Sequence, residues 1–283
     1  MVTQVARDTY ALDARMMGIP DAMSPYVVDA AEPVVVDPGP AAGIEHVIDD
    51  MEAAGVDPAE VAHILPTHVH LDHAGATGAL AEHCPNATVV VHERGVDYLV
   101  DAAKRDRLYE SARAAVGDEI ATGYGRPELV ERERCRVVSG GETVDCGDRS
   151  LELVSAPGHA PHQVAVLDGR TGALFAGDAA GMSLFGELLP TTPAPDFDLE
   201  LSLETVARLR ELDVETLCYG HYGARDDPDD ALAAYAELLP EWVAAVEETA
   251  AAHEDRDAIV AALSNEWSSP TIERDVAGVL QTL

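Results

Sequence analysis

The sequence predicts an α/β protein in which two small sheets pack face to face and carry helices on their outer sides. Short β-branched runs alternate with helical patterns on both sides of a strand-free stretch, residues 96–130. The 283 residues are 47% hydrophobic, which is enough for a sizeable core. No apolar run reaches the roughly 18 residues that a membrane helix needs, and charges at Arg7 and Asp8 argue against a signal peptide. We therefore expect a soluble, cytoplasmic protein.

The first part of the chain reads as a meander of short strands followed by a helix. Strands are predicted at 9–13, 26–29 and 33–36, because these runs are apolar and end at turn residues. A helix is predicted at 43–54, with its apolar residues on one face. The run 61–65 is a buried strand that ends at a proline and leads into a loop.

The loop after that strand is the densest group of metal-ligand side chains in the sequence. His68, His70, Asp72 and His73 lie within six residues, and imidazole and carboxylate groups are the ligands of Zn, Fe or Mn. A strand end followed by a tight loop turns such side chains toward one point. The first two could bind one ion and the last two a second ion beside it. A helix is expected to begin near Asp72 or His73.

The stretch 96–130 follows a strand at 87–91 and reads as one or two helices, with a glycine-rich break at 123–125. It carries a basic and aromatic cluster in an otherwise acidic chain. Two interpretations remain open: an exposed helix whose bases pair with nearby acids, or a lid that helps to hold an anionic substrate. The cluster comprises Lys104, Arg105, Arg107, Tyr109 and Arg113.

Three further candidate ligands each follow a predicted strand. His159 comes after the strand at 151–155, which is preceded by strands at 136–138 and 142–144. Asp178 ends a hairpin formed by strands at 164–167 and 173–176. His221 follows a strand at 216–219, and Tyr222 beside it could face the same cleft.

The remaining segments are assigned as connections and helices. The proline-rich stretch 182–198 is expected to be a connecting loop, and an amphipathic helix is predicted at 199–212. Helices are also predicted at 231–252, at 257–263 and from 270 to the end. These C-terminal helices could cap the cleft or form the contact of a homodimer, and the sequence does not choose.

The charge balance points to the conditions in which the protein works. Fifty-two acids face 18 bases, a net charge of −34, and the acids are spread along the whole chain. This is the surface of proteins from salt-loving organisms, since at molar salt the screening length falls to about 3 Å. Nucleic-acid binding is not expected, because no basic stripe exists to meet phosphates.

The loop sequence T-H-V-H-L-D-H-A-G resembles the first metal motif of the metallo-β-lactamase superfamily. The resemblance covers about residues 9–225 and implies a four-layer αββα sandwich with a helical insertion over the cleft at about 96–130. The last part, 226–283, lies outside it and would be a helical extension. Asp37 matches a carboxylate of the superfamily and would hold the metal-binding loop in place without itself binding the metal. The Pro-Gly-His context assigns the ligand role to His159 and leaves His162 as its supporting partner.

By this resemblance, His68, His70 and His159 would bind the first of two divalent ions, with Zn favoured and Fe or Mn as alternatives. Asp72, His73 and His221 would bind the second, and Asp178 would bridge the two. Such ions generate hydroxide near neutral pH, and Asp72 would orient it for attack on a carbonyl group.

The favoured function is hydrolysis of a thioester or ester of a small molecule. The alternatives are a lactonase, a phosphodiesterase or nuclease, and a mononuclear non-heme iron sulfur dioxygenase with two histidines and one carboxylate. A non-catalytic binding protein is a further alternative.

Overall fold

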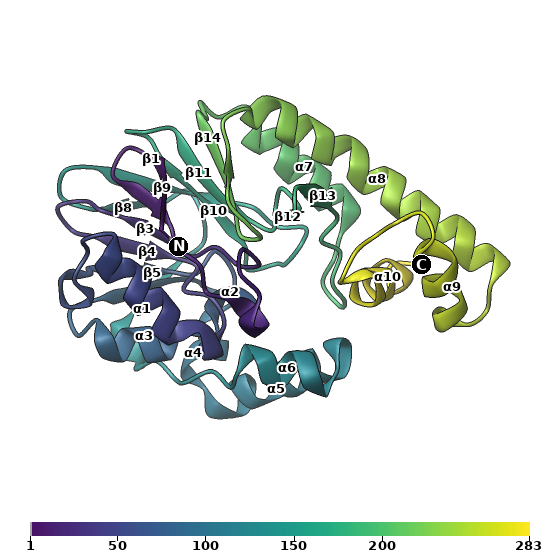
Figure 1. The fold of residues 1–283 in the computed structure, drawn as a ribbon, viewed down its shortest axis with the longest axis horizontal. Coiled ribbons are helices and arrows are strands. Elements are labelled where there is room, and N and C mark those ends of the chain that lie inside the picture. Colours follow the sequence, from purple (N-terminus) through teal and green to yellow (C-terminus); the bar gives the residue numbers. More distant parts are fainter. Residues whose placement is uncertain (1) are drawn as a thin grey trace.

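Two β-sheets pack against each other in the computed structural model, which describes residues 2–283 (Figure 1). In the first sheet the spatial order of the strands follows the sequence. These strands are β1 Thr3–Ala6, β2 Thr9–Ala11, β3 Tyr26–Val28, β4 Val34–Val36, β5 His63–Leu65, β6 Thr88–His92 and β7 Cys135–Val138. The first four are antiparallel neighbours, whereas β4 to β7 run parallel. The carboxyl ends of β4, β5 and β6 therefore lie at one edge.

The second sheet has a less regular order. In space its strands are β15 Ala224–Arg225, β14 Thr216–Tyr219, β11 Ala173–Gly177, β10 Val164–Asp168, β9 Ser150–Ser155 and β8 Thr143–Asp145. Because β10 is antiparallel to both β9 and β11, and β14 is parallel to β11, the strands β9, β11 and β14 end on the same side. A buried apolar layer joins the sheets, and in it the rings of Tyr26 and Phe175 meet edge to face at 5.1 Å.

Helices cover the outer faces of both sheets. The α-helices are α1 Ile44–Ala53, α2 Leu71–Ala74, α3 Thr77–His83, α4 Val96–Val100, α5 Ala102–Val116, α6 Asp118–Tyr124, α7 Leu199–Leu209, α8 Pro228–Ala252, α9 Arg256–Leu263 and α10 Ile272–Leu280. Short 3-10 turns occupy Met16–Gly18, Ala41–Gly43, Pro58–Glu60 and Arg132–Arg134. Figure 1 shows α1 and α3 on the side of the first sheet and α7 and α8 on the side of the second. The expected αββα sandwich is confirmed.

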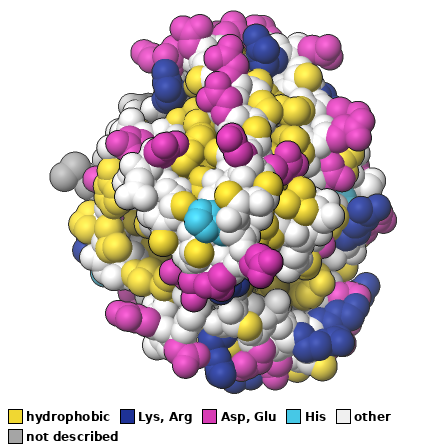
Figure 2. Space-filling view, turned by 90° about the vertical axis from the view of Figure 1, so that its right-hand side faces the viewer, with side chains coloured by type: hydrophobic (Ala, Val, Ile, Leu, Met, Phe, Trp, Pro, Cys, Tyr) yellow, Lys and Arg dark blue, Asp and Glu magenta, His cyan; other side chains and the backbone are white. Residues whose placement is uncertain are grey.

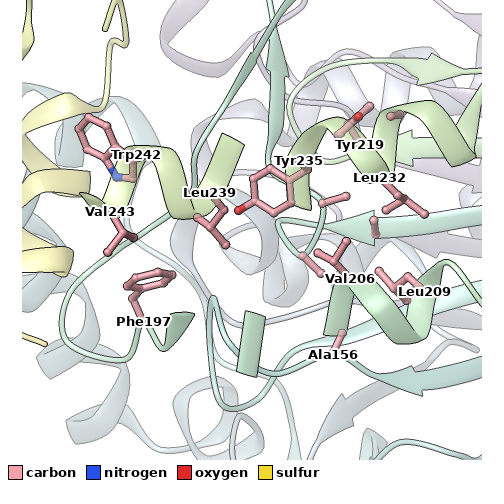
Figure 3. Packing of buried hydrophobic residues seen from close by; sticks show 14 of the residues in the cluster. Ala156, Phe197, Val206, Leu209, Tyr219, Leu232, Tyr235, Leu239, Trp242 and Val243 are labelled. Carbon is pink, nitrogen blue, oxygen red and sulfur yellow. The ribbon is translucent and has the colours of Figure 1, made fainter. Parts of the chain in front are cut away.

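The C-terminal helices share one core with the second sheet. Tyr235, Leu239 and Trp242 of α8 belong to the same buried cluster as Val206 of α7, and Figure 3 shows Val243 of α8 beside Phe197. The same buried cluster continues into α9 and α10. Burying apolar area is worth roughly 25 cal/mol per Å², so this shared core holds residues 228–280 firmly on the sheet.

Some local expectations were wrong. The stretch 182–198 is not only a loop, because it contains a hairpin of β12 Met182–Leu184 and β13 Glu187–Leu189. Its two turn residues, Phe185 and Gly186, both have positive φ, as a tight two-residue hairpin turn requires. The proline content of the stretch concealed this hairpin. Strands β1 and β15 were also not predicted, and the helix expected from residue 72 onward is divided into α2 and α3.

The acidic residues are distributed over the surface. Figure 2, which faces the side of the C-terminal helices, shows acidic side chains across the whole face, with Lys and Arg at only a few places. Among residues 2–283, no helix combines the length and the apolar character needed to cross a bilayer.

Candidate metal centre

The predicted ligands meet where the ends of the two sheets come together. The first group follows β5, in the loop and in the one-turn helix α2. In the second sheet, His159 follows β9, Asp178 follows β11 and His221 follows β14. Because these strands end at neighbouring edges, residues far apart in the chain are brought together, and Asp72 and His221, 149 positions apart, come within 3.6 Å of each other.

Three histidines form the first cluster. The Nδ1 atom of His70 lies 3.0 Å from the Nε2 atom of His68 and 3.0 Å from the Nε2 atom of His159. Ligands on a tetrahedral zinc ion lie ~3.3 Å apart when each bond is about 2.0–2.1 Å. The three nitrogens thus have nearly the separation that a single ion requires, and they can hold one.

A second cluster lies directly beside the first. Asp72, His73 and His221 offer ligand atoms that lie within 4.8 Å of one another. The carboxylate of Asp178 stands between the clusters, with one oxygen 3.4 Å from His159 Nε2 and the other 3.2 Å from His73 Nε2. This carboxylate is therefore placed to reach an ion in either cluster.

The ring nitrogens that point away from the centre are fixed by other groups. His159 Nδ1 lies 3.1 Å from the carbonyl oxygen of Thr191, and His221 Nδ1 lies 2.9 Å from that of Ala22. His68 Nδ1 lies 3.1 Å from the hydroxyl of Thr67. Such partners set the tautomer and the ring orientation of metal-binding histidines.

Asp37 fixes His73 in the same way. One oxygen of its buried carboxylate lies 3.0 Å from His73 Nδ1, and the backbone N–H and the hydroxyl of Thr67 donate to the two oxygens at 2.6 and 2.9 Å. Its φ of 49° places it in the left-handed region, which Asp tolerates better than most residues. His162 is also close: its Nδ1 accepts the backbone N–H of Val69 at 3.4 Å, and its ring is stacked on that of His68.

Several polar atoms at the centre are in contact but not satisfied by hydrogen bonds. The Nε2 atoms of His73 and His221 and one oxygen of Asp178 are buried and make no hydrogen bond of good geometry with the described residues, although His73 Nε2 and that oxygen lie 3.2 Å apart. Buried polar atoms are normally paired, so this group of orphaned atoms is an unexplained cost in the protein alone. Divalent cations in the two clusters would satisfy all of them, and the residues present therefore fit such ions.

The ionisation of these groups also favours cation binding. Burial holds the pKa of His68 and His70 well below the ordinary value, so both rings are neutral near pH 7 and keep a lone pair for a metal. Burial acts to raise the pKa of Asp178, but the surrounding imidazoles hold it well below its usual range. Burial acts to lower the pKa of His73, yet the nearby carboxylates hold it well above the ordinary value. Positive charge is therefore favoured at this point.

The residues predicted to contact substrate lie in different places. Lys104 pairs with Asp97, and Arg105 donates to Asp106 at 2.7 Å. Arg107 is exposed and lines a surface cavity with Lys104. The remaining two residues of the cluster contact their own surroundings, with the Tyr109 hydroxyl 3.4 Å from the carbonyl oxygen of Ala121 and Arg113 paired with Glu110 and Asp118.

Tyr222 does not line the cavity at the metal clusters. Burial and the nearby Asp21 raise its pKa, and it lines a different surface cavity.

A cavity of about 120 Å³ opens directly onto the metal clusters. Its walls include His70 and Asp72, and apolar residues of α5 form much of the rest. Tyr124 of α6 and Arg274 of α10 also line it, and neither was singled out from the sequence. Tyr124 stood in the break expected between helices, and Arg274 stood in the extension to which no role could be assigned.

The protein thus combines an αββα sandwich with two adjoining clusters of histidine and aspartate at the edge where its sheets meet. These features define a class of metal-binding α/β proteins. The family model of the metallo-beta-lactamase superfamily matches residues 21–221. The chain belongs to the metallo-beta-lactamase superfamily.

Individual relatives cover different shares of the chain. A metallo-beta-lactamase fold-containing protein of Sulfurisphaera tokodaii is 29% identical over 77% of this chain and 79% of its own length. An N-acyl homoserine lactonase of Azorhizobium caulinodans is 34% identical over 42% of this chain and 40% of its own. A hydroxyacylglutathione hydrolase of Gloeothece citriformis is 31% identical over 59% of this chain and 49% of its own. This chain thus matches less than half of the length of the lactonase and of the hydroxyacylglutathione hydrolase.

Among solved structures, the fold is similar to that of an archaeal metallo-beta-lactamase superfamily protein from Sulfolobus tokodaii. The TM-score is 0.72 at 27% identity, with 82% of this chain and 85% of that chain covered.

Proposed function

We propose that this protein is a hydrolase that holds two divalent metal ions, preferably zinc, and cleaves the ester or thioester bond of a small molecule. The observation that carries the proposal is the convergence of buried ligand atoms of His73, His221 and Asp178 that make no hydrogen bond of good geometry. They lie beside His70 Nδ1, which is 3.0 Å from the Nε2 atoms of both His68 and His159. The superfamily consists mostly of metal-dependent hydrolases, which supports the same conclusion.

The chemistry divides between the ions and the chain. Ions bound in these clusters would lower the pKa of a bound water to near 7 and polarise a carbonyl oxygen. Asp72 is the side chain we assign to orienting that water, because it belongs to the second cluster and also lines the cavity. Asp178 holds the two clusters at a fixed separation. The mostly apolar wall on the α5 side excludes water from the reacting groups.

The cavity favours a small acyl compound over a phosphodiester. Its wall contains the apolar side chains of Leu71, Leu108 and Val116, and among the described residues that line it Arg274 is the one Lys or Arg. Recognition of a nucleic-acid backbone relies on several cations. Together with the net charge of −34, this argues against a nuclease.

Lactone hydrolysis is the second candidate. The observation in its favour is the similarity to several enzymes named N-acyl homoserine lactonase, over about two fifths of the chain. A lactone is a cyclic ester, so the same clusters would act on it and only the shape of the cavity would select between the two.

The decisive experiment combines metal analysis with a substrate panel. Elemental analysis of the purified protein is expected to find close to two zinc-type ions per chain, and activity is expected on esters, thioesters or lactones but not on phosphodiesters. Asp178→Asn is expected to lower kcat about 100-fold or more, since even groups behind the ligands are worth 10–100-fold. Asp49→Asn, on an exposed position of α1, is the matched control.

Two results would contradict the proposal. One iron per chain together with oxygen uptake would assign the clusters to an oxygenase. Full turnover by Asp178→Asn, with the fold intact by circular dichroism, would exclude chemistry that depends on both clusters.

A further inference from the structure

Arg274 reaches the cavity at the metal clusters from a helix outside the family match. The match ends at residue 221, whereas Arg274 belongs to α10, close to the end of the chain. In Figure 1, α10 lies on the side of the second sheet above α5 and α6, and α10 contacts α5. The side chain of Arg274 lines the same cavity as Asp72 and Tyr124.

The helix that carries Arg274 is tightly anchored. The buried carboxylate of Asp275 accepts the backbone N–H of Thr192 at 3.0 Å and the hydroxyl of Thr271 at 2.6 Å. The hydroxyl of Thr192 donates to the backbone carbonyl of Asp275 at 2.9 Å. A side chain at Gly278 would overlap the carbonyl oxygen of Thr192, so only glycine permits this approach. The position of Arg274 is therefore fixed by the fold.

The hydrogen-bonding capacity of Arg274 is almost unused. Its side chain is only 13% exposed, and within residues 2–283 its one hydrogen bond is a long contact of 3.4 Å to Asp275. The Nε atom is buried without a partner. A guanidinium group has five N–H donors, and the carboxylate of Asp275 is already engaged by Thr192 and Thr271. Pairing with Asp275 thus does not account for a buried arginine at this place.

The electrostatic surroundings explain why the group remains charged. Burial acts to lower the pKa of Arg274, but Asp275, Tyr124, Asp72 and Asp178 together hold it above its ordinary value. Two of these acids, Asp72 and Asp178, belong to the metal clusters. Ions bound there would neutralise these carboxylates and leave the guanidinium facing the cavity with its donors free. A buried cation in that state has a high affinity for an anion.

We propose that Arg274 binds a carboxylate of the substrate, so that the preferred substrates are small esters, thioesters or lactones that carry a carboxylate a few atoms from the scissile carbonyl group. This assignment rests on the proposed function, because it places the scissile group at the metal clusters. A planar guanidinium can bind a carboxylate through two parallel hydrogen bonds. With one such group in a mostly apolar wall, the orientation of the substrate follows from that single contact.

The test compares two thiols of equal chain length, one of which ends in a carboxylate and the other in an uncharged hydroxyl group. The probes are 3-mercaptopropionate and 3-mercapto-1-propanol, whose sulfur atoms both coordinate zinc, and their binding to the zinc-loaded full-length protein is measured by calorimetry at low salt. The wild type is expected to bind the carboxylate probe about tenfold or more tightly than the alcohol. Arg274→Gln is expected to bind both probes equally, with its zinc content and its affinity for the alcohol unchanged.

Two further variants make the comparison specific. Arg274→Lys keeps the charge without the planar fork and is expected to retain part of the preference for the carboxylate. Arg256→Gln removes an exposed arginine from the neighbouring helix α9 and is expected to behave as the wild type.

Each remaining outcome overturns the assignment. If the wild type shows no preference, or if Arg274→Gln keeps it, Arg274 does not bind the carboxylate while the proposed hydrolase is untouched. Loss of zinc or of the fold in both Arg274 variants would make the residue a structural counter-charge. If the protein takes up no zinc, or neither thiol binds the zinc-loaded protein, the metal centre itself is wrong and the assignment falls with it.

Discussion

Replacing Asp37 with Asn tests whether the metal centre depends on a residue that hydrogen bonds to a ligand without binding the metal itself. Asn has the same size as Asp and also tolerates the positive φ at this position, so the backbone is not disturbed. The substitution changes only the charge and the nature of the atom that faces His73. In the native protein the carboxylate accepts from His73 Nδ1 at 3.0 Å, which leaves Nε2, 3.2 Å from Asp178, as the nitrogen that would bind a metal ion.

The expected magnitude follows from the tautomer of His73. An amide that keeps its oxygen toward the backbone N–H of Thr67 presents its NH₂ group to Nδ1, which must then accept a hydrogen bond. Nε2 would carry the proton and lose its capacity as a ligand. Comparable changes weaken metal binding 10–100-fold, which is about 1.4–2.7 kcal/mol.

Competition titration with a chromogenic zinc chelator measures this effect. The wild type is expected to show two dissociation constants, of which Asp37→Asn weakens one by the stated factor and leaves the other nearly unchanged. Asp198→Asn is the control, because the side chain of Asp198 caps α7 and belongs to neither metal cluster, and Asn is an equally good cap. Two unchanged dissociation constants in Asp37→Asn would refute the view that Asp37 orients His73.

Two further predictions concern close packing and charge. A Cβ at Gly220 would lie 2.5 Å from Cε1 of His73, so Gly220→Ala is expected to displace that ring and remove one of two zinc ions. The control is Gly169→Ala, whose new Cβ meets nothing within 4 Å, and it should retain both ions. Equal zinc contents of the two variants by elemental analysis would contradict this prediction. The net charge of −34 predicts that molar KCl raises the melting temperature by at least several degrees, since ~1 kcal/mol corresponds to about 2–4 °C. A melting curve indifferent to KCl would exclude adaptation to salt.

Much of the fold and the convergence of the candidate ligands could be predicted from the sequence. His68, His70, Asp72 and His73 are dense enough to be recognised locally, and the strand before them is a clear apolar run ending at Pro66. The distant candidates each follow a strand, and parallel strands of one sheet end at a common edge. This rule brings together the three candidates of the second sheet, whereas their union with the loop of the first sheet was implied by the resemblance to the superfamily.

Among the groups that orient the ligands, Asp37 was recognised by the resemblance, but the backbone carbonyls had no such signal. His159 and His221 are held by the backbone carbonyls of Thr191 and Ala22. Every residue type has a backbone carbonyl, so these contacts leave no trace in the sequence. Arg274 was equally invisible, because nothing in a single sequence connects the last helix with a cavity formed around residue 72. Such contacts depend on tertiary packing and on chain separations of up to about 200 residues.

The segment around Thr191 and Thr192 shows why the C-terminal helices should be considered part of the metal centre. Thr191 accepts from His159 through its carbonyl and donates its hydroxyl to the carbonyl of Asp178 at 2.8 Å. Thr192 is held by Asp275 of α10 and accepts the indole N–H of Trp242 of α8 at 3.0 Å. Two adjacent residues therefore connect two predicted ligands with two C-terminal helices. The position of Arg274 and the orientation of His159 are consequently set by the same short segment, which couples the site that would bind a substrate anion to the site that would bind the metal.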